Sequence, residues 1–365
     1  MASSGPGRPA KKVRSGNPAV RSGAAPANPS AAKPAAAKRS AAGSSVARPL
    51  PSTTSGAPLV AAADVLPPDG VAYPQILRGP TYVWWRSMLG VVFGLSMFAL
   101  LTTVISQLVI ALGWALTAGD RLYADYFREA FAFERPVGML GVNLGIASLI
   151  PIAGAMVVVV HRVRPQWLAS VQPRIRWRYL LICLVIALVS LNGVLLLSQL
   201  FVDTPVVGRQ AGFWGFLVVI LLTSPLQAAA EEVFFRGYLM QALGSLVAQP
   251  WFGVVVSSVV FALLHGTQNL PLFVDRLAFG LLAAILVWRT GGLEAGIAAH
   301  VINNVFAYVI AGLTTSIAGL KATQGIGWVD AAFDVGGFAV YALLAYLAFR
   351  MLRLRHTVDL AAVQR

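Results

Sequence analysis

Residues 212–246 read GFWGFLVVILLTSPLQAAAEEVFFRGYLMQALGSL, an apolar run interrupted near its middle by two glutamates and an arginine. A membrane-spanning helix needs about 20 apolar residues, and this run is long enough. An ionised side chain inside such a helix costs about 2.5–3.5 kcal/mol on insertion scales, so these groups usually face a polar interior. The stretch therefore predicts a transmembrane helix that carries a buried polar site.

Similar apolar runs occur along most of the chain. Its 365 residues are 57% hydrophobic and 12% charged, whereas a soluble domain averages about 25% charged residues. The candidate spans are residues 88–116, 138–160, 179–201, 212–246, 252–268, 272–288, 292–313 and 335–352. The sequence thus predicts an all-α, polytopic integral membrane protein with about eight transmembrane helices.

Basic residues are concentrated in particular connections. The net charge is +14, and residues 1–87 account for +9 of it. The connection 161–178 carries five arginines and no acid, whereas the connection 117–137 is slightly acidic. This alternation follows the positive-inside rule with both termini cytoplasmic, which requires an even number of spans. Basic ends of a membrane protein explain the charge without a nucleic-acid partner.

The chain divides into a tail and a membrane domain. Residues 1–80 are mostly Ala, Pro, Ser, Gly and basic residues, too polar to bury an apolar core, so we expect a disordered cytoplasmic tail near lipid head groups. Residues 81–356 form the predicted membrane domain, and residues 357–365 a cytoplasmic C-terminal tail. The low-complexity tail is of a bacterial kind, so we expect a bacterial plasma membrane.

Three polar pairs lie in apolar segments at the i, i+4 spacing of a helix. They are Glu232 with Arg236, Phe261 with His265, and His300 with Asn304. At about 100° per residue, Glu232 and Arg236 lie about 40° apart and can form an ion pair. The adjacent carboxylate, Glu231, points about 140° away from Arg236. Glu231 is thus expected to be less paired and able to act as general base toward water.

Each remaining group has a chemical interpretation and a structural one. The Phe261 ring can pack beside His265 and fix its rotamer, although a lone histidine in an apolar helix is more often a packed core residue. His300 and Asn304 share one helix face and can supply two donors to an oxyanion, or a metal ligand and an orienting amide. A structural charge cluster at the membrane edge is the alternative for Glu231, Glu232 and Arg236.

Helix lengths give the depth of these groups. If helices end near residue 246 and begin near residue 252, Glu231 and His265 lie about 20 Å from that turn at 1.5 Å per residue. His300 lies about 12 Å into its own helix from the same side. All three are expected to open toward the cytoplasmic leaflet. The zinc-protease sequence His-Glu-x-x-His, the Gly-x-Ser-x-Gly elbow and the phosphate loop are absent from the chain.

Glu-Glu-x-x-x-Arg, Phe-x-x-x-His and His-x-x-x-Asn, in this order on successive helices, resemble the CPBP family of intramembrane proteases. That family includes the type II CAAX prenyl endopeptidases and relatives linked to bacteriocin immunity. The resemblance covers about residues 210–313. It implies an eight-helix fold and hydrolysis of a peptide bond by activated water.

The resemblance also implies roles for individual residues. Glu231 and His265 activate the water, and His300 and Asn304 stabilise the oxyanion. Glu232, Arg236 and Phe261 support them. A zinc ion bound by Glu231, His265 and His300 is one form of this site, and a metal-free mechanism is the other.

The sequence predicts an intramembrane endopeptidase that acts on a membrane-associated protein or peptide. A non-catalytic scaffold or regulator of the same fold is the alternative, with the polar helix faces serving packing. A transporter is a third interpretation, because buried Glu and His also serve proton relays.

Overall fold

The computed structural model describes residues 65–201 and 206–363, all of which belong to the compact unit Ala57–Arg365. Within these residues the structure is helical, with no strand and two isolated β-bridges. The elements are η1 (Tyr73–Gln75), α1 (Trp84–Thr117), α2 (Tyr123–Phe131), α3 (Pro136–Ala147), α4 (Leu149–Ala155), η2 (Met156–His161), η3 (Pro165–Leu168), α5 (Trp177–Ser198), α6 (Phe213–Glu231), η4 (Glu232–Leu239), α7 (Met240–Gly244), α8 (Trp251–Leu263), α9 (Leu270–Thr290), α10 (Glu294–Thr314), α11 (Ile317–Ala322), α12 (Trp328–Met351) and α13 (Leu360–Val363).

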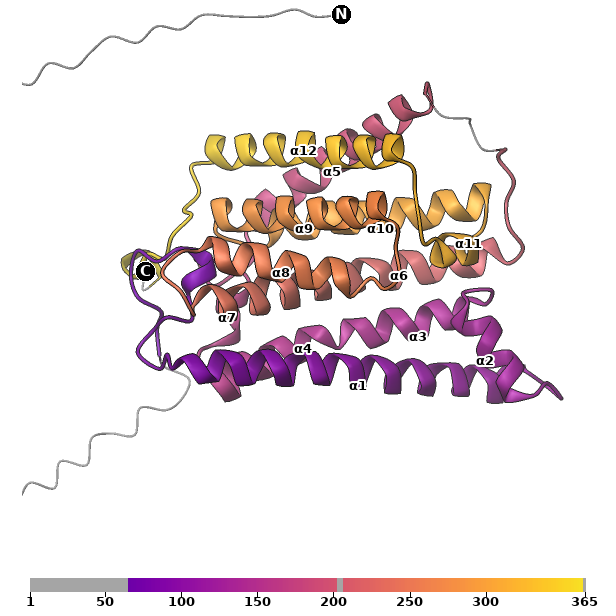
Figure 1. Cartoon of the computed structure of the whole chain (residues 1–365), viewed down its shortest axis with the longest axis horizontal. Helices are drawn as coiled ribbons and strands as arrows, with labels where there is room; N and C mark the ends of the chain where they lie inside the picture. The colour runs from indigo at the N-terminus through magenta and orange to yellow at the C-terminus, as the bar shows by residue number, and fades with distance from the viewer. Residues whose placement is uncertain (1–64, 202–205, 364–365) are drawn as a thin grey trace, which may run out of the picture. The chain divides into compact units, whose positions relative to one another are not determined.

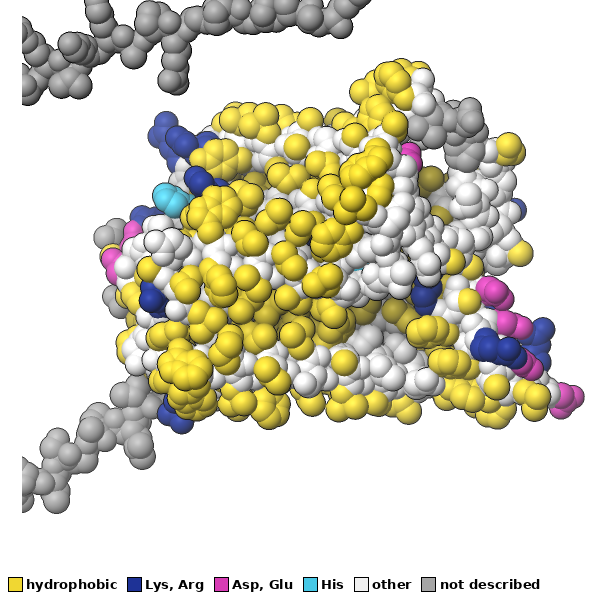
Figure 2. Space-filling model, in the orientation of Figure 1, with side chains coloured by type: hydrophobic (Ala, Val, Ile, Leu, Met, Phe, Trp, Pro, Cys, Tyr) yellow, Lys and Arg dark blue, Asp and Glu magenta, His cyan; other side chains and the backbone are white. Residues whose placement is uncertain are grey.

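Seven helical segments are long and apolar enough to cross a membrane, which confirms the polytopic all-α prediction. They are α1, α3 to η2, α5, α6 to α7, α9, α10 and α12. Their lipid-facing side chains form a broad apolar surface, with charged side chains gathered at the two ends (Figure 2). A helix suits this environment because all its interior backbone hydrogen bonds are made within the segment.

The helices run back and forth along one common direction (Figure 1). Going around the bundle, α1 packs against α3, α3 against α6, and α6 against α10. The helix α10 also packs against α5, which contacts α12, while α9 contacts both α12 and α8. The continuous segment α6, η4 and α7 therefore lies between the N-terminal and C-terminal helices, where its polar residues are enclosed.

Helix α8 is shorter than predicted. It has 13 residues and is about 20 Å long, whereas the hydrocarbon core of a membrane is about 30 Å thick. The helix ends because the His265 side chain replaces a backbone donor: its Nδ1 lies 2.8 Å from the carbonyl oxygen of Phe261. Gly266 then adopts a left-handed conformation with φ of 81°, and Asn269 caps the next helix. The predicted span 252–268 is thus a partial one.

The two ends of the membrane domain meet at the same end of the bundle. The amide of Gly70 donates to the carbonyl oxygen of Val358, and the amide of Val358 donates to that of Val71, at 2.9 and 3.0 Å. Ala72 and Thr357 form an isolated antiparallel bridge. This arrangement agrees with an even number of chain crossings, the partial one at α8 included.

The predicted tail boundary at residue 80 is too late. Residues 65–80 are part of the described structure, and Tyr73, Ile76 and Leu77 are buried in the main hydrophobic core. The Tyr73 hydroxyl donates to the carbonyl oxygen of Leu168. These three apolar side chains explain why the segment packs. The prediction missed them because it rested on the average composition of residues 1–80. Residues 1–64 of the predicted tail lie outside the described residues.

The predicted C-terminal tail is also packed in part. Val358 is 2% exposed and α13 begins two residues later. The Asp69 carboxylate accepts a hydrogen bond from the amide of Leu360 at 2.9 Å. The N-terminal segment therefore holds the last residues of the chain in place.

Candidate functional site

The junction of α6 and η4 carries the two glutamates. Arg236 Nη1 donates to Glu232 Oε1 at 2.9 Å, and both side chains are buried, which confirms the ion pair expected from the i, i+4 spacing. The helix changes from α to π geometry at Glu232 and stays so through Leu239. Such wide turns are rare and occur frequently at functional sites. Here the wide turn begins at the residue that follows Glu231, so it lies at the start of the site.

His300 on α10 lies between the two carboxylates. Its Nδ1 is 2.8 Å from Glu232 Oε1, and its Nε2 is 3.2 Å from Glu231 Oε2. Glu231 is therefore paired, contrary to the expectation from helix geometry alone. Its partner comes from a helix 69 positions later in the chain, which the angular arithmetic within one helix could not include. The two ring nitrogens fix the orientation of the imidazole.

His265 and Phe261 interact as the sequence predicts. Their ring centroids lie 4.6 Å apart in an edge-on arrangement. Because a carbonyl oxygen only accepts, the 2.8 Å contact with Phe261 requires a proton on His265 Nδ1. In the neutral ring this leaves the Nε2 lone pair free to face water, a substrate or a metal ion. His265 lies beyond the end of α8 and is exposed.

Asn304 is held by a residue that the sequence motifs did not indicate. Its Nδ2 donates to Gln227 Oε1 on α6 at 3.0 Å, and its Oδ1 accepts from Asn303 at 3.3 Å. Gln227 precedes Glu231 by four residues, so it lies on the same side of α6 one turn earlier. That spacing is the signal by which Gln227 could have been found. The Asn303 amide thus bonds within α10.

Aromatic rings enclose the charged groups. The guanidinium of Arg236 lies 4.1 Å from the ring centre of Phe261 and 5.4 Å from that of Phe279. Phe279 on α9 also contacts the His300 ring edge-on at 5.1 Å. Such cation–π contacts contribute up to about 2 kcal/mol when they are desolvated. Phe279 is a second site residue that the sequence motifs did not indicate.

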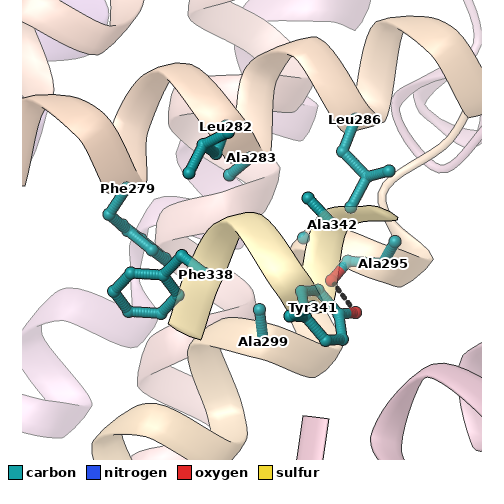
Figure 3. A pocket seen from close by; sticks show the side chains of 10 residues that line it. Phe279, Leu282, Ala283, Leu286, Ala295, Ala299, Phe338, Tyr341 and Ala342 are labelled. Atoms are coloured by element: carbon teal, nitrogen blue, oxygen red, sulfur yellow. Dashed lines mark hydrogen bonds between the residues drawn. The ribbon is translucent and has the colours of Figure 1, made fainter. Parts of the chain in front are cut away.

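Behind Phe279 is an apolar recess between α9, α10 and α12 (Figure 3). Phe279 and Phe338 lie side by side in it, with their ring centres 4.7 Å apart. Tyr341 has the one polar side chain among the lining residues, and its hydroxyl donates to the carbonyl oxygen of Ala295 at 2.7 Å. The recess therefore offers no free donor or acceptor near His300 and backs the site with an apolar wall.

Gly296 on α10 allows the close approach of Glu232. A Cβ atom at Gly296 would lie 2.6 Å from Glu232 Oε2, a distance that real Cβ atoms do not adopt. In the described structure Glu232 Oε2 and Arg236 Nη2 are buried without a hydrogen-bond partner. Buried polar atoms of this kind are commonly satisfied by an ordered water molecule. The ion pair therefore leaves one acceptor and one donor unused within the buried site.

Access to the site differs between its two sides. Every residue from 234 to 245 is buried, so the side toward α7 and the basic end of the bundle is closed. On the other side, residues 263–267 are exposed and residues 301–310 are partly exposed. This contradicts the expectation of a chamber open toward the basic end. The large side chains after Arg236, such as Tyr238 and Met240, fill that route.

The residues present fit part of a zinc site. Two ligands of a tetrahedral zinc ion lie about 3.3 Å apart for metal–ligand distances of about 2.0–2.1 Å, and Glu231 Oε2 and His300 Nε2 lie 3.2 Å apart. Glu232 accepts from the other ring nitrogen of His300, as carboxylates commonly do behind a metal-bound histidine. Within the described residues, however, no three His, Cys, Asp or Glu side chains are grouped closely enough to hold a metal. Since Glu231 and His300 are adjacent, His265 is the proposed ligand that is not grouped with the other two.

Comparison with known proteins finds two similarities of sequence. Residues 213–306 match the family model of type II CAAX prenyl endopeptidases, described as Rce1-like. Over 144 residues the chain is 30% identical to uncharacterized protein YyaK of Bacillus subtilis (strain 168). That alignment covers 36% of this chain, and the chain spans about half (48%) of the length of the relative. The resemblance predicted from the three polar pairs is thus confirmed over residues 213–306, which are similar to type II CAAX prenyl endopeptidases of the Rce1-like kind.

Proposed function

We propose that the protein is an intramembrane endopeptidase that hydrolyses a peptide bond of a membrane-associated protein or peptide. The observation that supports this most is the position of His300, whose two ring nitrogens each face a glutamate at 2.8 and 3.2 Å. Such a pairing sets proton positions in a buried site, where general acid–base chemistry requires them. The match to a family of endopeptidases adds independent support.

Water is the second reactant, and the chain between α8 and α9 favours its presence. Residues 264–269 are not helical, and at membrane depth such backbone is tolerated only inside protein or beside a water-filled cavity. Residues 264–267 are exposed, so they are not inside protein. We infer that they line a water-filled entrance beside His265. Peptides that lie in the membrane then reach the site from the side of residues 263–270.

In the proposed reaction, Glu231 accepts a proton from water while the water oxygen forms a bond to the carbonyl carbon of the substrate. His265 Nε2 orients this water, because Nδ1 is held by Phe261. Once Glu231 has taken up the proton, the Nε2–H of His300 is released from that carboxylate and donates to the oxyanion. The Asn304 Nδ2 hydrogen that Gln227 does not bind is the second donor, and one such donor commonly contributes about 10²–10³-fold. The C–N bond then breaks, and the amine takes up the proton that Glu231 accepted.

Glu232 and Arg236 hold the reacting groups without touching the substrate. Glu232 accepts from both Arg236 and His300, so it ties the π-helical segment to α10. Gln227 holds the Asn304 amide with its donors in a fixed direction. These residues are positioning residues in the proposed site.

A zinc form of the same site remains part of the proposal. Glu231, His265 and His300 would hold the ion if His265 moved toward the other two side chains, and the ion would supply a bound water with a pKa of about 7. His265 has its Nε2 free for this purpose, and Glu232 would support His300 from behind. Cleavage depends on Glu231 and His265 in both forms, as metal ligands or as the groups that act on the water, so the substitutions that test the proposal are the same.

The test is cleavage of a membrane-anchored peptide by the purified full chain in proteoliposomes. We expect Glu231→Ala and His265→Ala to abolish cleavage while both variants insert and unfold cooperatively. Full activity in both variants would refute the assignment of the site. If folded wild-type protein cleaves no member of a broad peptide panel, and the variants lose binding of a partner instead, the protein is a scaffold of this fold.

A further inference from the structure

An open cavity of about 460 Å³ lies at the basic end of the bundle, away from the polar site. It is formed between the start of α5 and the chain that follows α12, near the end where Lys and Arg side chains gather in Figure 2. The side chains that decide its chemistry are Arg174, Arg176, Arg178, Trp177, Leu352 and Leu354. None of the residues that line this cavity is acidic.

The three arginines of the cavity differ in how they are paired. Arg176 is buried and binds the Glu294 carboxylate through Nε and Nη2 at 2.8 and 2.6 Å. Arg174 and Arg178 are exposed, and among the described residues neither side chain has a hydrogen-bond or ion-pair partner. The cavity therefore carries two uncompensated positive charges and one that is neutralised.

The backbone at the start of α5 adds to this potential. The helix is 22 residues long, and its N-cap residue Arg176 donates its amide to the Glu294 carboxylate at 2.8 Å. The next two amides, of Trp177 and Arg178, are the ones that remain for a ligand. The first amides of a helix lack partners within the helix, and its dipole favours an anion there. Two free guanidinium groups beside these amides form a site for a phosphate group.

The surface that continues from the cavity is apolar. Trp177 is 67% exposed, and Leu181 and Val185 follow it at helical steps of four residues with 60% and 61% exposed. Leu352 and Leu354 form the opposite wall of the cavity. A soluble anion would make no contact with these apolar side chains, whereas the acyl chains of a phospholipid would cover them.

We propose that this cavity binds an anionic phospholipid, with its phosphate between Arg174 and Arg178 and its acyl chains along α5. The position agrees with the positive-inside rule, because basic pockets between helices on the cytoplasmic side bind anionic head groups. This site is independent of the proposed peptide hydrolysis.

Occupancy of the cavity stabilises the frame of the polar site. Arg176 lines the cavity and also donates to the carbonyl oxygens of Thr290 and Arg355, at 2.8 and 3.3 Å. It holds Glu294, the first residue of α10, and His300 lies on the same helix. A lipid that binds here therefore contacts the start of α5 and the chain after α12, beside the Arg176–Glu294 pair that holds α10.

The experiment is a titration of the purified full chain in detergent with phosphatidylglycerol or phosphatidylcholine, followed by native mass spectrometry. We expect one saturable phosphatidylglycerol site and no comparable phosphatidylcholine site. Arg174→Ala combined with Arg178→Ala should weaken phosphatidylglycerol binding about 30-fold, because each basic residue near the surface contributes about fivefold. Thermal unfolding without added lipid checks that this double variant is folded.

The matched control is Arg78→Ala combined with Arg289→Ala, which removes two exposed arginines outside the cavity lining. It should leave the saturable site unchanged. Equal weakening in both double variants would overturn the proposal in favour of diffuse surface charge. Competition by millimolar inorganic phosphate, with stabilisation by phosphate alone, would overturn it in favour of a soluble anion.

Discussion

His300 Nδ1 donates to Glu232 Oε1 over 2.8 Å, and the same oxygen accepts from Arg236 Nη1 at 2.9 Å. One carboxylate oxygen thus joins the helices of the first and third motifs, η4 and α10. Both Glu232 and Arg236 are buried, where water does not solvate their charges, so each serves as the counter-charge of the other. Glu231 differs because its side chain lies on the other side of the imidazole, toward the accessible half of the site.

Glu231 and Glu232 should respond differently to the same substitution. Glu231→Gln removes the proposed base, and we expect cleavage to fall by about 10²–10⁴-fold with little loss of stability. Glu232→Gln leaves the buried Arg236 without its counter-charge, and we expect the free energy of unfolding to fall by about 3–5 kcal/mol. Cleavage rates and thermal unfolding in detergent measure the two effects. Equal loss of stability in both variants would contradict the division of roles.

Gly296 should not tolerate a methyl group. Gly296→Ala places Cβ 2.6 Å from Glu232 Oε2, so the ion pair or α10 must move, at a cost of about 1–3 kcal/mol. Gly336→Ala is the matched control, because a Cβ there meets no atom within 4 Å and alanine favours a helix by about 1 kcal/mol. Thermal unfolding distinguishes the two. A neutral Gly296→Ala variant with full activity would show that the close contact is unimportant.

Gln227 should affect the rate of cleavage more than stability. Gln227→Ala frees the Asn304 amide to rotate, and we expect kcat to fall about tenfold, with KM little changed, because a donor to the oxyanion is misdirected. Gln227→Glu keeps the acceptor and should restore part of the rate. Gln199→Ala, at the end of α5, is a control for the loss of a glutamine side chain. A rise in KM alone would point to substrate binding instead.

Metal removal distinguishes the two forms of the site. For the zinc form, elemental analysis of the purified protein should give near-stoichiometric zinc that is lost in the Glu231→Ala, His265→Ala double variant. A chelator should then abolish cleavage, and added zinc should restore it. For the metal-free form, the wild-type protein should cleave fully with no metal above background. Metal that is retained by the double variant would contradict the proposed ligands.

Contacts within one helix could be predicted from the sequence, because helical spacing fixes them. The ion pair of Glu232 with Arg236 and the packing of Phe261 on His265 are of this kind. Seven of the eight predicted spans also follow from apolar length alone. The early end of α8 does not, because it depends on a side-chain bond from His265 to the backbone.

Contacts between helices could not be derived in this way. The pairing of Glu231 with His300 needs the relative rotation of α6 and α10, and so does the bond between Gln227 and Asn304. Phe279 contacts His300, but as one apolar residue in an apolar helix it gives no sequence signal of a site. The site is closed toward the basic end because side chains pack around α7. A hydropathy profile gives the apolar length of a helix but not which side chains fill the space beside it.

The most direct test of the central claim compares peptide termini in membranes incubated with wild-type protein or with Glu231→Gln, in water enriched in ¹⁸O. We predict new C-terminal carboxylates that carry one ¹⁸O atom from water with the wild-type protein, and none of these with Glu231→Gln. The same set of termini with both proteins, each shown to be folded, would contradict hydrolysis by water activated at Glu231.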